Sequence, residues 1–213
     1  AEGSKEMKAI LGGKGANLAE MTNLGVPVPP GFTISTAVCE LYYANDRQYP
    51  AGLNEEVSKN LDRLEGMMGR QLGDSSDPLL VSVRSGAAVS MPGMMDTILN
   101  LGMNDQAVSG LADITGNERF AWDAYRRFIQ MFGNVAKGVP HEEFEDILEG
   151  VKKAKGVEHD TELDADDLKS IVKKYKAAYK KVLKSEFPQG PKDQLQAAIE
   201  PHSLAAGRCC AST

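Results

Sequence analysis

The apolar and polar positions of the first hundred residues follow helical spacing in some stretches and extended spacing in others. Residues at intervals of three before a glycine predict a helix that stops there, namely Leu18, Met21 and Leu24 before Gly25. A short strand is expected over 32–34 and a helix over 37–44. A further helix, capped by Asn54, carries an apolar stripe of Val57, Leu61, Leu64 and Met68. This mixture of short strands and helices predicts an α/β layer.

The apolar run after Pro78 is typical of a strand, which Ser85 and Gly86 would end. With a period of two, one face holds Leu79, Val81 and Val83, and the other holds Leu80, Ser82 and Arg84. Arg84 is therefore expected at the carboxyl end of a strand, where open α/β sheets hold their ligands. A guanidinium group suits phosphate because it is permanently charged and forked. The alternative is a solvated or salt-bridged arginine.

From about residue 104 onward the chain is expected to be entirely helical, with caps at Asn117 and Asp164 and a short last helix that starts at Gly190-Pro191. The apolar stripes are Phe120, Ala124, Phe128, Met131 and Val135; Phe144, Ile147, Leu148 and Val151; Leu168, Ile171, Val172, Tyr175, Tyr179 and Val182; and Leu195 and Ile199. Aromatic residues at such spacings favour a core over ligand stacking. The expected organisation is an α/β lobe over 1–103, a helical subdomain over 104–200 and a divergent, disordered tail over 201–213.

Composition excludes several classes of function. A net charge of -6 and a pI near 5.2 argue against a nucleic-acid footprint, and the lysines of 152–184 alternate with acids as on a solvated helix face. No apolar run approaches the length of a membrane helix. Cys39, Cys209 and Cys210 form no disulfide framework and no metal motif, so a reducing compartment is expected, cytoplasmic or inside an organelle.

A glycine-flanked lysine stands immediately before the first helical repeat, in the run LGGKGANLAEM over 11–21. Glycine lets the backbone approach a bulky anion, and a helix start presents unpaired N–H groups to it, so Lys14 between Gly13 and Gly15 suits phosphate. The run is not a Walker A loop, because Lys8 stands where that motif needs its first glycine. It is not a dinucleotide-binding fingerprint either, because Leu18 stands at the third glycine position. A plain glycine-rich turn is the alternative.

These two motifs occur in order with three further segments, VPVPPGFT over 26–33, SMPGMMDT over 90–97 and RFAWDAYRRFI over 119–129. Together they resemble the N-terminal region of the pyruvate phosphate dikinase family from about residue 8 to about residue 200. The related phosphoenolpyruvate synthases share the GGK lysine and the V-R-S element, but they continue with an acidic, alanine-rich segment in place of Met-Pro-Gly-Met-Met-Asp. The resemblance is therefore specific to the dikinases.

The resemblance implies one half of an ATP-grasp module, which passes the β-phosphoryl group of ATP to a histidine on a separate swivelling domain. A barrel domain then exchanges that group with pyruvate, so that ATP, phosphate and pyruvate become AMP, pyrophosphate and phosphoenolpyruvate. Lys14 and Arg84 match residues that contact the ATP phosphates, with weaker roles for Gly13, Gly15 and Asp96. The Mg²⁺ ligands, the carrier histidine and the pyruvate domain are expected outside this chain, and the full-length enzyme is expected to be a homo-oligomer.

Other candidate residues receive simpler interpretations. None of His141, His159 and His202 has the neighbours of the family's carrier histidine, and the first two are expected to be solvated. The acidic run over 160–167 lacks the glycine and the final glutamate of an EF-hand, so helix capping explains it better than metal binding.

The tail after Glu200 departs from the family, since Pro201 breaks the expected helix and small residues follow. The chain is therefore expected to be a truncated dikinase without activity of its own. A non-catalytic nucleotide-binding or interaction module is the alternative from another class. A fragment of a phosphoenolpyruvate synthase or glucan dikinase is disfavoured by the segment over 90–93.

Overall fold

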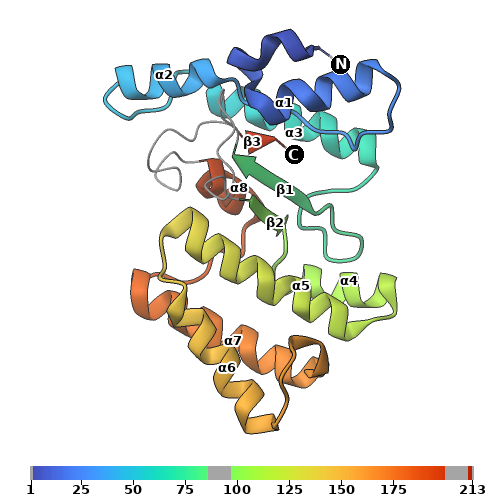
Figure 1. Ribbon diagram of the computed structural model, residues 1–213, viewed down its shortest axis with the longest axis vertical. Helices are drawn as coiled ribbons and strands as arrows, with labels where there is room; N and C mark the ends of the chain where they lie inside the picture. Colours follow the sequence, from blue (N-terminus) through green and yellow to red (C-terminus); the bar gives the residue numbers. More distant parts are fainter. Residues whose placement is uncertain (1, 86–96, 200–210, 213) are drawn as a thin grey trace. The chain divides into compact units, whose positions relative to one another are not determined.

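The structure, a computed structural model, describes residues 2–85, 97–199 and 211–212 and is mostly helical (Figure 1). Its elements are η1 (Lys5–Met7), α1 (Lys8–Asn23), α2 (Thr36–Ala44), α3 (Leu53–Met68), β1 (Val81–Ser85), β2 (Thr97–Leu101), α4 (Ala107–Thr115), α5 (Glu118–Met131), η2 (Phe132–Ala136), α6 (Glu142–Lys155), η3 (Asp160–Glu162), α7 (Ala165–Leu183), α8 (Pro191–Ile199) and β3 (Ala211–Ser212). Of the expected tail, 201–210 and 213 lie outside the described residues. Between residues 104 and 199 all the regular secondary structure that is described is helical, as predicted.

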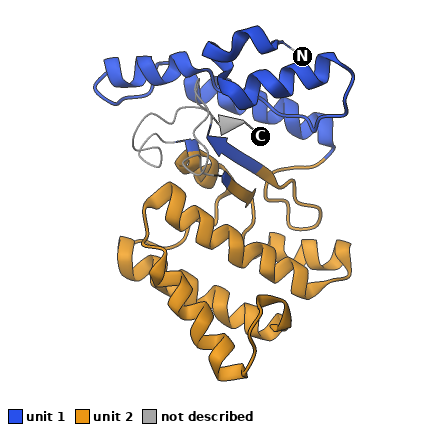
Figure 2. Cartoon of the chain, in the orientation of Figure 1, with its two compact units in different colours: residues 1–69, 82–97, 199–213 blue, residues 70–81, 98–198 orange. Residues whose placement is uncertain are grey.

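The chain divides into two compact units (Figure 2). Unit 1 comprises residues 1–69, 82–97 and 199–213, and unit 2 comprises residues 70–81 and 98–198. The boundary between them passes through β1 and β2.

The β-structure is smaller than the expected α/β layer. The strands follow the order β2-β1-β3, and β1 runs antiparallel to β3 with Arg84 opposite Ser212. The strand expected over 32–34 is reduced to a bridge at Thr33. Pro29 and Pro30 lie before it and have no N–H group to donate, so a ladder could not extend through them toward the N-terminus. The expected α/β class is thus confirmed only as a mixed α+β fold with little β.

Helix α3 contributes much of the core of unit 1. Val57, Leu61 and Leu64 are buried on one face, as their spacing predicts. Met68 is 40% exposed, so its place in that stripe was wrong, because the helix ends there and Gly69 takes a left-handed conformation. Asn54 was also wrong as a cap. The N-cap is Gly52, at φ 89°, and Asn54 lies in the first turn.

Unit 2 is built around aromatic side chains from α5, η2 and α7. Phe187 is buried, and its ring lies 5.3–6.4 Å from those of Tyr125, Phe128, Phe132 and Tyr179. The segment after α7 thus closes the core of the helices that precede it.

The predicted caps of unit 2 are confirmed. The Asn117 side chain accepts a hydrogen bond from the Phe120 amide at 2.9 Å, and the Asp164 side chain accepts one from the Asp167 amide. The predicted stripe on α5 needs a correction, because Phe120 is 50% exposed while Ala121 is buried. The buried face therefore runs one residue out of phase with the predicted one at its start.

Two sequence-based expectations concern the environment of the chain. Within the described ranges, no helix is long and apolar enough to cross a membrane. The expectation that the cysteines form no disulfide is wrong for Cys39, which is disulfide-bonded. The distance between cysteines along the sequence does not limit their distance in the fold. Cys209 and Cys210 lie outside the described residues.

Candidate functional site

The glycine-rich turn of unit 1 forms a helix start inside α1. Gly12 has φ 69° and ψ 170°, a conformation that interrupts the helix and that glycine adopts without the steric cost of a Cβ. A second helical segment begins just beyond it, so Lys14 lies in that segment's first turn. The first amides of a helix lack intrahelical partners and carry a partial positive charge. The predicted placement of Lys14 at a helix start is therefore confirmed.

The neighbouring glycine is buried against another part of unit 1. A Cβ added at Gly15 would lie 3.1 Å from Thr33 Cγ2, 3.2 Å from Thr33 Oγ1 and 3.2 Å from Leu11 Cβ. These distances are shorter than ordinary van der Waals contacts. Gly15 therefore allows the second segment of α1 to approach the bridge at Thr33 closely. Gly13 is half-buried.

Lys14 reaches the end of β1. Its Nζ donates a hydrogen bond to the Ser85 carbonyl oxygen at 2.9 Å, across 71 residues of sequence. Ser85 is buried, whereas the side chain of Arg84 next to it is exposed. Both residues belong to unit 1. The fold thus connects the two basic motifs of the sequence at one strand end.

The strand presents its residues as the period of two predicts. Leu79, Val81 and Val83 are buried, Ser82 is half-buried and Arg84 is exposed. Arg84 therefore keeps its charge in solvent beside the contact that Lys14 makes. Asp96 lies outside the described residues, as does the rest of 86–96. Sequence reasoning missed the Ser85 carbonyl and Thr33, because a backbone acceptor and a packing contact leave no mark in a motif.

Comparisons with known proteins agree with the family resemblance that the sequence motifs indicate. Residues 8–65 match the family model described as "Pyruvate phosphate dikinase, AMP/ATP-binding domain". Over 93% of its length the chain is 58% identical to the chloroplastic pyruvate, phosphate dikinase of Mesembryanthemum crystallinum and 54% identical to the pyruvate, phosphate dikinase of Clostridium symbiosum. The chain corresponds to the N-terminal region of pyruvate phosphate dikinases. It spans 21% of the length of the first relative and 23% of the length of the second.

The histidines of this chain lie in peripheral positions where the structure describes them. His141 precedes α6 with its side chain 62% exposed, and its Nε2 lies 3.5 Å from Glu145 Oε2. His159 is exposed and caps η3, where Glu162 completes the capping box. The expectation that both are solvated is confirmed. His202 lies outside the described residues.

The acidic run over 160–167 has structural roles. Asp164 and Asp167 cap α7 reciprocally, each side chain accepting from the other's amide at 3.0 Å. A hydrogen bond from Lys155 and one from the Asp167 amide hold the pKa of Asp164 down to about 2. The capping interpretation is confirmed for Glu162, Asp164 and Asp167, whereas the Asp160 carboxylate forms ion pairs with Arg126 and Lys152. No group of three or more His, Cys, Asp or Glu side chains in the described ranges could hold a metal ion.

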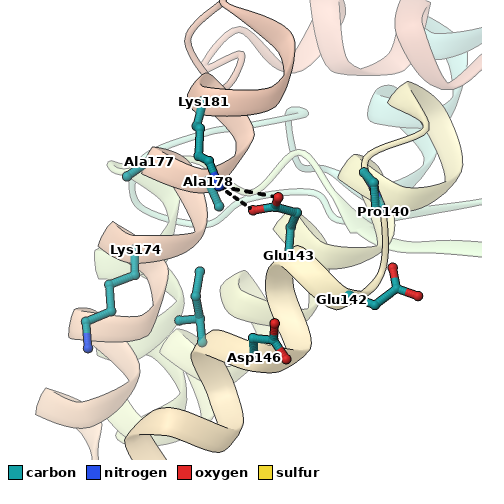
Figure 3. Close-up of a pocket in the computed structure, with 9 residues that line it drawn as sticks. Pro140, Glu142, Glu143, Asp146, Lys174, Ala177, Ala178 and Lys181 are labelled. Atoms are coloured by element: carbon teal, nitrogen blue, oxygen red, sulfur yellow. Dashed lines mark hydrogen bonds and ion pairs between the residues drawn. The ribbon is translucent and has the colours of Figure 1, made fainter.

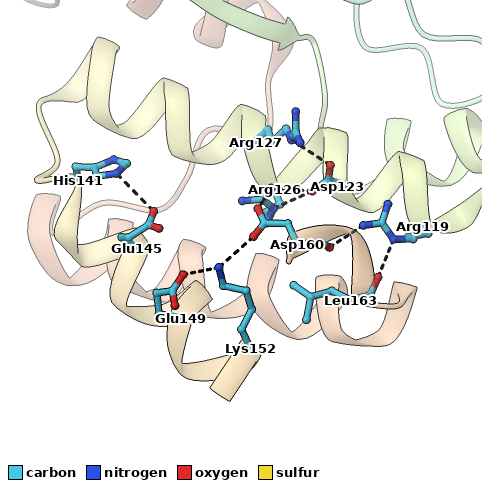
Figure 4. A network of polar contacts seen from close by, with 10 residues as sticks. All are labelled: Arg119, Asp123, Arg126, Arg127, His141, Glu145, Glu149, Lys152, Asp160 and Leu163. Atoms are coloured by element: carbon cyan, nitrogen blue, oxygen red, sulfur yellow. Dashed lines mark hydrogen bonds and ion pairs between the residues drawn. The ribbon is translucent and has the colours of Figure 1, made fainter. Parts of the chain in front are cut away.

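A buried arginine joins three elements of unit 2 (Figure 4). Arg126 is 3% exposed, and its Nη2 lies 2.8 Å from Asp123 Oδ1 and 3.2 Å from Asp160 Oδ2. Lys152 Nζ lies 3.4 Å from Asp160 Oδ1, and Arg119 Nη2 donates to the Asp160 carbonyl at 2.7 Å. Arg126 and Lys152 thus face carboxylates, whereas Arg119 donates to the backbone carbonyls of Asp160 and Leu163. The network therefore holds η3 against α5 and α6, and we assign it no chemical role.

A groove between α6 and α7 has a volume of about 580 Å³ (Figure 3). Its lining is Pro140, Glu142, Glu143, Asp146 and Ile147 on one side, and Lys174, Ala177, Ala178 and Lys181 on the other. Glu143 forms an ion pair with Lys181 at 3.2 Å. Three carboxylates in one wall disfavour a polyphosphate. The groove contains none of the residues that the sequence singled out as nucleotide-binding candidates.

Proposed function

We propose that unit 1 supplies one half of the ATP site of a pyruvate phosphate dikinase, with Lys14 and Arg84 binding the phosphates of the nucleotide. The hydrogen bond from Lys14 Nζ to the Ser85 carbonyl is the observation that carries this proposal. It connects the glycine-rich helix start with the strand end that bears Arg84. The match of residues 8–65 to an AMP/ATP-binding domain supports the choice of nucleotide.

The chemistry of the two side chains suits this role. A lysine ammonium acts as a point charge toward phosphate, and an arginine guanidinium binds two oxygens in a fork. The amides at the helix start around Lys14 add a positive dipole end. Gly13 is half-buried and keeps this turn free of a side chain, so that a phosphate could approach the backbone closely, whereas Gly15 contributes through its close packing on Thr33. For Asp96 we propose only a weaker contact on the nucleotide side.

The remaining chemistry of the proposed reaction needs parts that longer relatives possess. In the full reaction ATP, phosphate and pyruvate become AMP, pyrophosphate and phosphoenolpyruvate, by way of a phosphohistidine. We place the carrier histidine, the pyruvate site and the ligands of Mg²⁺ outside this chain, together with the second half of the ATP-grasp module. In a half-site exposed to water, each charge interaction at 4 Å contributes about 1 kcal/mol, against several times that in a closed site. Positioning and metal-assisted neutralisation dominate phosphoryl transfer, and half a site supplies little of either.

The test is an ATP titration of the purified 213-residue chain, followed by NMR, beside assays for AMP and phosphoenolpyruvate. We expect weak, saturable ATP binding that Lys14→Ala and Arg84→Ala each reduce at least fivefold, and no product above the level of the double variant. Lys174→Ala removes an equal charge from a surface of unit 2 and is expected to leave ATP binding unchanged.

Two outcomes would contradict the proposal. If Lys14→Ala and Arg84→Ala bind ATP as the parent chain does, these residues are not the phosphate ligands. If the parent chain forms AMP and phosphoenolpyruvate and the double variant does not, the chain contains a complete active site and the assignment of a half-site is wrong.

A further inference from the structure

The close contact between Gly15 and Thr33 lies one residue away from the proposed phosphate ligand Lys14. A Cβ at Gly15 would lie 3.1–3.2 Å from three atoms, two on Thr33 and one on Leu11. A contact that short requires a neighbour to move by a few tenths of an ångström. Gly15 is buried, so a new side chain at this position has no solvent into which it could turn.

The atoms on both sides of Gly15 have little freedom to move. Leu11 Cβ belongs to the first segment of α1, on the far side of the interruption at Gly12. Thr33 is β-branched, which restricts its rotamers, and its backbone takes part in a bridge. Three residues later, Thr36 Oγ1 donates a hydrogen bond to the Ala9 carbonyl at 2.7 Å. The segment that carries Thr33 is thus fastened to the first segment of α1, the helix to which Gly15 belongs.

From this geometry we infer that Gly15 and Thr33 are a positioning pair, which sets the place of the Lys14 ammonium at the end of β1. The inference rests on the proposed function of Lys14. Any side chain at Gly15 pushes the second segment of α1 away from Thr33, and Lys14 moves with that segment. Its Nζ then loses the 2.9 Å contact with the Ser85 carbonyl, which holds the ammonium beside Arg84. Neither member of the pair needs to touch the nucleotide.

The decisive variant is Gly15→Ala in the full 213-residue chain, with ATP and inorganic tripolyphosphate as the probes. We expect at least a tenfold loss of affinity for both probes, while the far-ultraviolet circular dichroism stays that of the parent chain. Gly66→Ala is the matched control. Gly66 lies inside α3 of the same unit, and a Cβ added there meets nothing within 4 Å. We expect it to leave both affinities unchanged.

Two further measurements separate positioning from a general loss of structure. In a Lys14→Ala background, Gly15→Ala is expected to cause no further loss of affinity, because a residue that acts through Lys14 has no effect once that side chain is gone. Adding Thr33→Ala to Gly15→Ala removes two of the three close contacts. We expect the pair to recover at least threefold of the lost affinity.

If Gly15→Ala does not fold, Thr36→Ala and Thr36→Ser decide the question. The alanine variant loses the bond to the Ala9 carbonyl, and we expect at least a threefold loss of ATP affinity, whereas the serine variant keeps a hydroxyl and its affinity. Equal affinities for these two variants, or parent-like affinity in a folded Gly15→Ala, would overturn the inference and leave the role of Lys14 standing. An unchanged affinity in Lys14→Ala alone would instead overturn the proposed function.

Discussion

Phe187 offers the sharpest test of how unit 2 is held together. This residue lies outside every predicted helix, yet its side chain is 3% exposed and contacts four aromatic rings, from Tyr125, Phe128, Phe132 and Tyr179. Phe187→Ala removes the ring and leaves a cavity among them. The variant is therefore expected to lower the free energy of unfolding of unit 2 strongly.

The size of the effect follows from the burial and the ring contacts. Replacing a buried phenylalanine by alanine costs about 3–5 kcal/mol. Each well-oriented aromatic pair adds about 0.5–1.5 kcal/mol beyond its buried area, so four lost pairs place Phe187 toward the upper part of that range. Small domains are stable by about 5–15 kcal/mol, so this change removes a large share of the total. Phe120→Ala deletes the same ring from a side chain that is 50% exposed, and we expect it to cost less than about 1 kcal/mol.

The assay is equilibrium unfolding in urea, followed by tryptophan fluorescence. Trp122 is the only tryptophan of the chain, and it lies in α5 with its ring 6.2 Å from that of Tyr125. Its emission therefore reports on unit 2. With an m-value of about 2 kcal/mol/M, a loss of about 4 kcal/mol lowers the midpoint by about 2 M urea. Midpoints for Phe187→Ala and Phe120→Ala within about 0.5 M of each other would refute the aromatic core described here.

The ion network and the buried tyrosines of unit 2 give two further predictions. Arg126→Ala removes the buried guanidinium that Asp123 and Asp160 share and is expected to destabilise by about 3–5 kcal/mol, whereas Arg127→Ala removes an exposed partner of Asp123 and should cost less than about 1 kcal/mol in the same urea assay. Burial raises the pKa of Tyr175 and Tyr179 to about 12, so the unfolded state loses these protons near pH 10 and the folded state does not. Stability is then fully present below about pH 10 and falls as the pH rises toward 12; a flat urea midpoint from pH 9 to 11.5 would contradict this.

Local rules predicted the parts of the site and of the fold that depend on neighbouring residues. The alternation that exposes Arg84 and buries Val83 follows from the period of a strand. The caps at Asn117 and Asp164 follow from the unpaired amides of a helix start, three residues away at most. The glycine-rich turn before the helical repeat likewise predicted that Lys14 lies at a helix start.

Predictions of which residues of a helix are buried, and of where a helix begins, were less accurate. Phe120 and Ala121 are adjacent, and both continue the helical stripe of α5 with acceptable spacing. The neighbouring helices decide which of them is buried. Asn54 is a good capping residue, but Gly52 takes the left-handed conformation that starts α3 two residues earlier. The choice in each case follows from packing around the helix, which lies beyond the reach of its own sequence.

The sequence by itself determined which residues carry charge, which glycines free the backbone and where α5, α7 and the second segment of α1 begin, since these depend on contacts within about four residues. Only the tertiary structure decided that Lys14 meets the carbonyl of Ser85, 71 residues away, and that Gly15 is closed in by Thr33. It also decided that Phe187, between two helices, completes an aromatic core. Contacts between distant segments arise from the burial of whole faces, and many pairings of such faces satisfy the same local pattern. The sequence pattern therefore predicts what depends on interactions between near neighbours in the chain, and the tertiary structure decides what depends on interactions between distant segments.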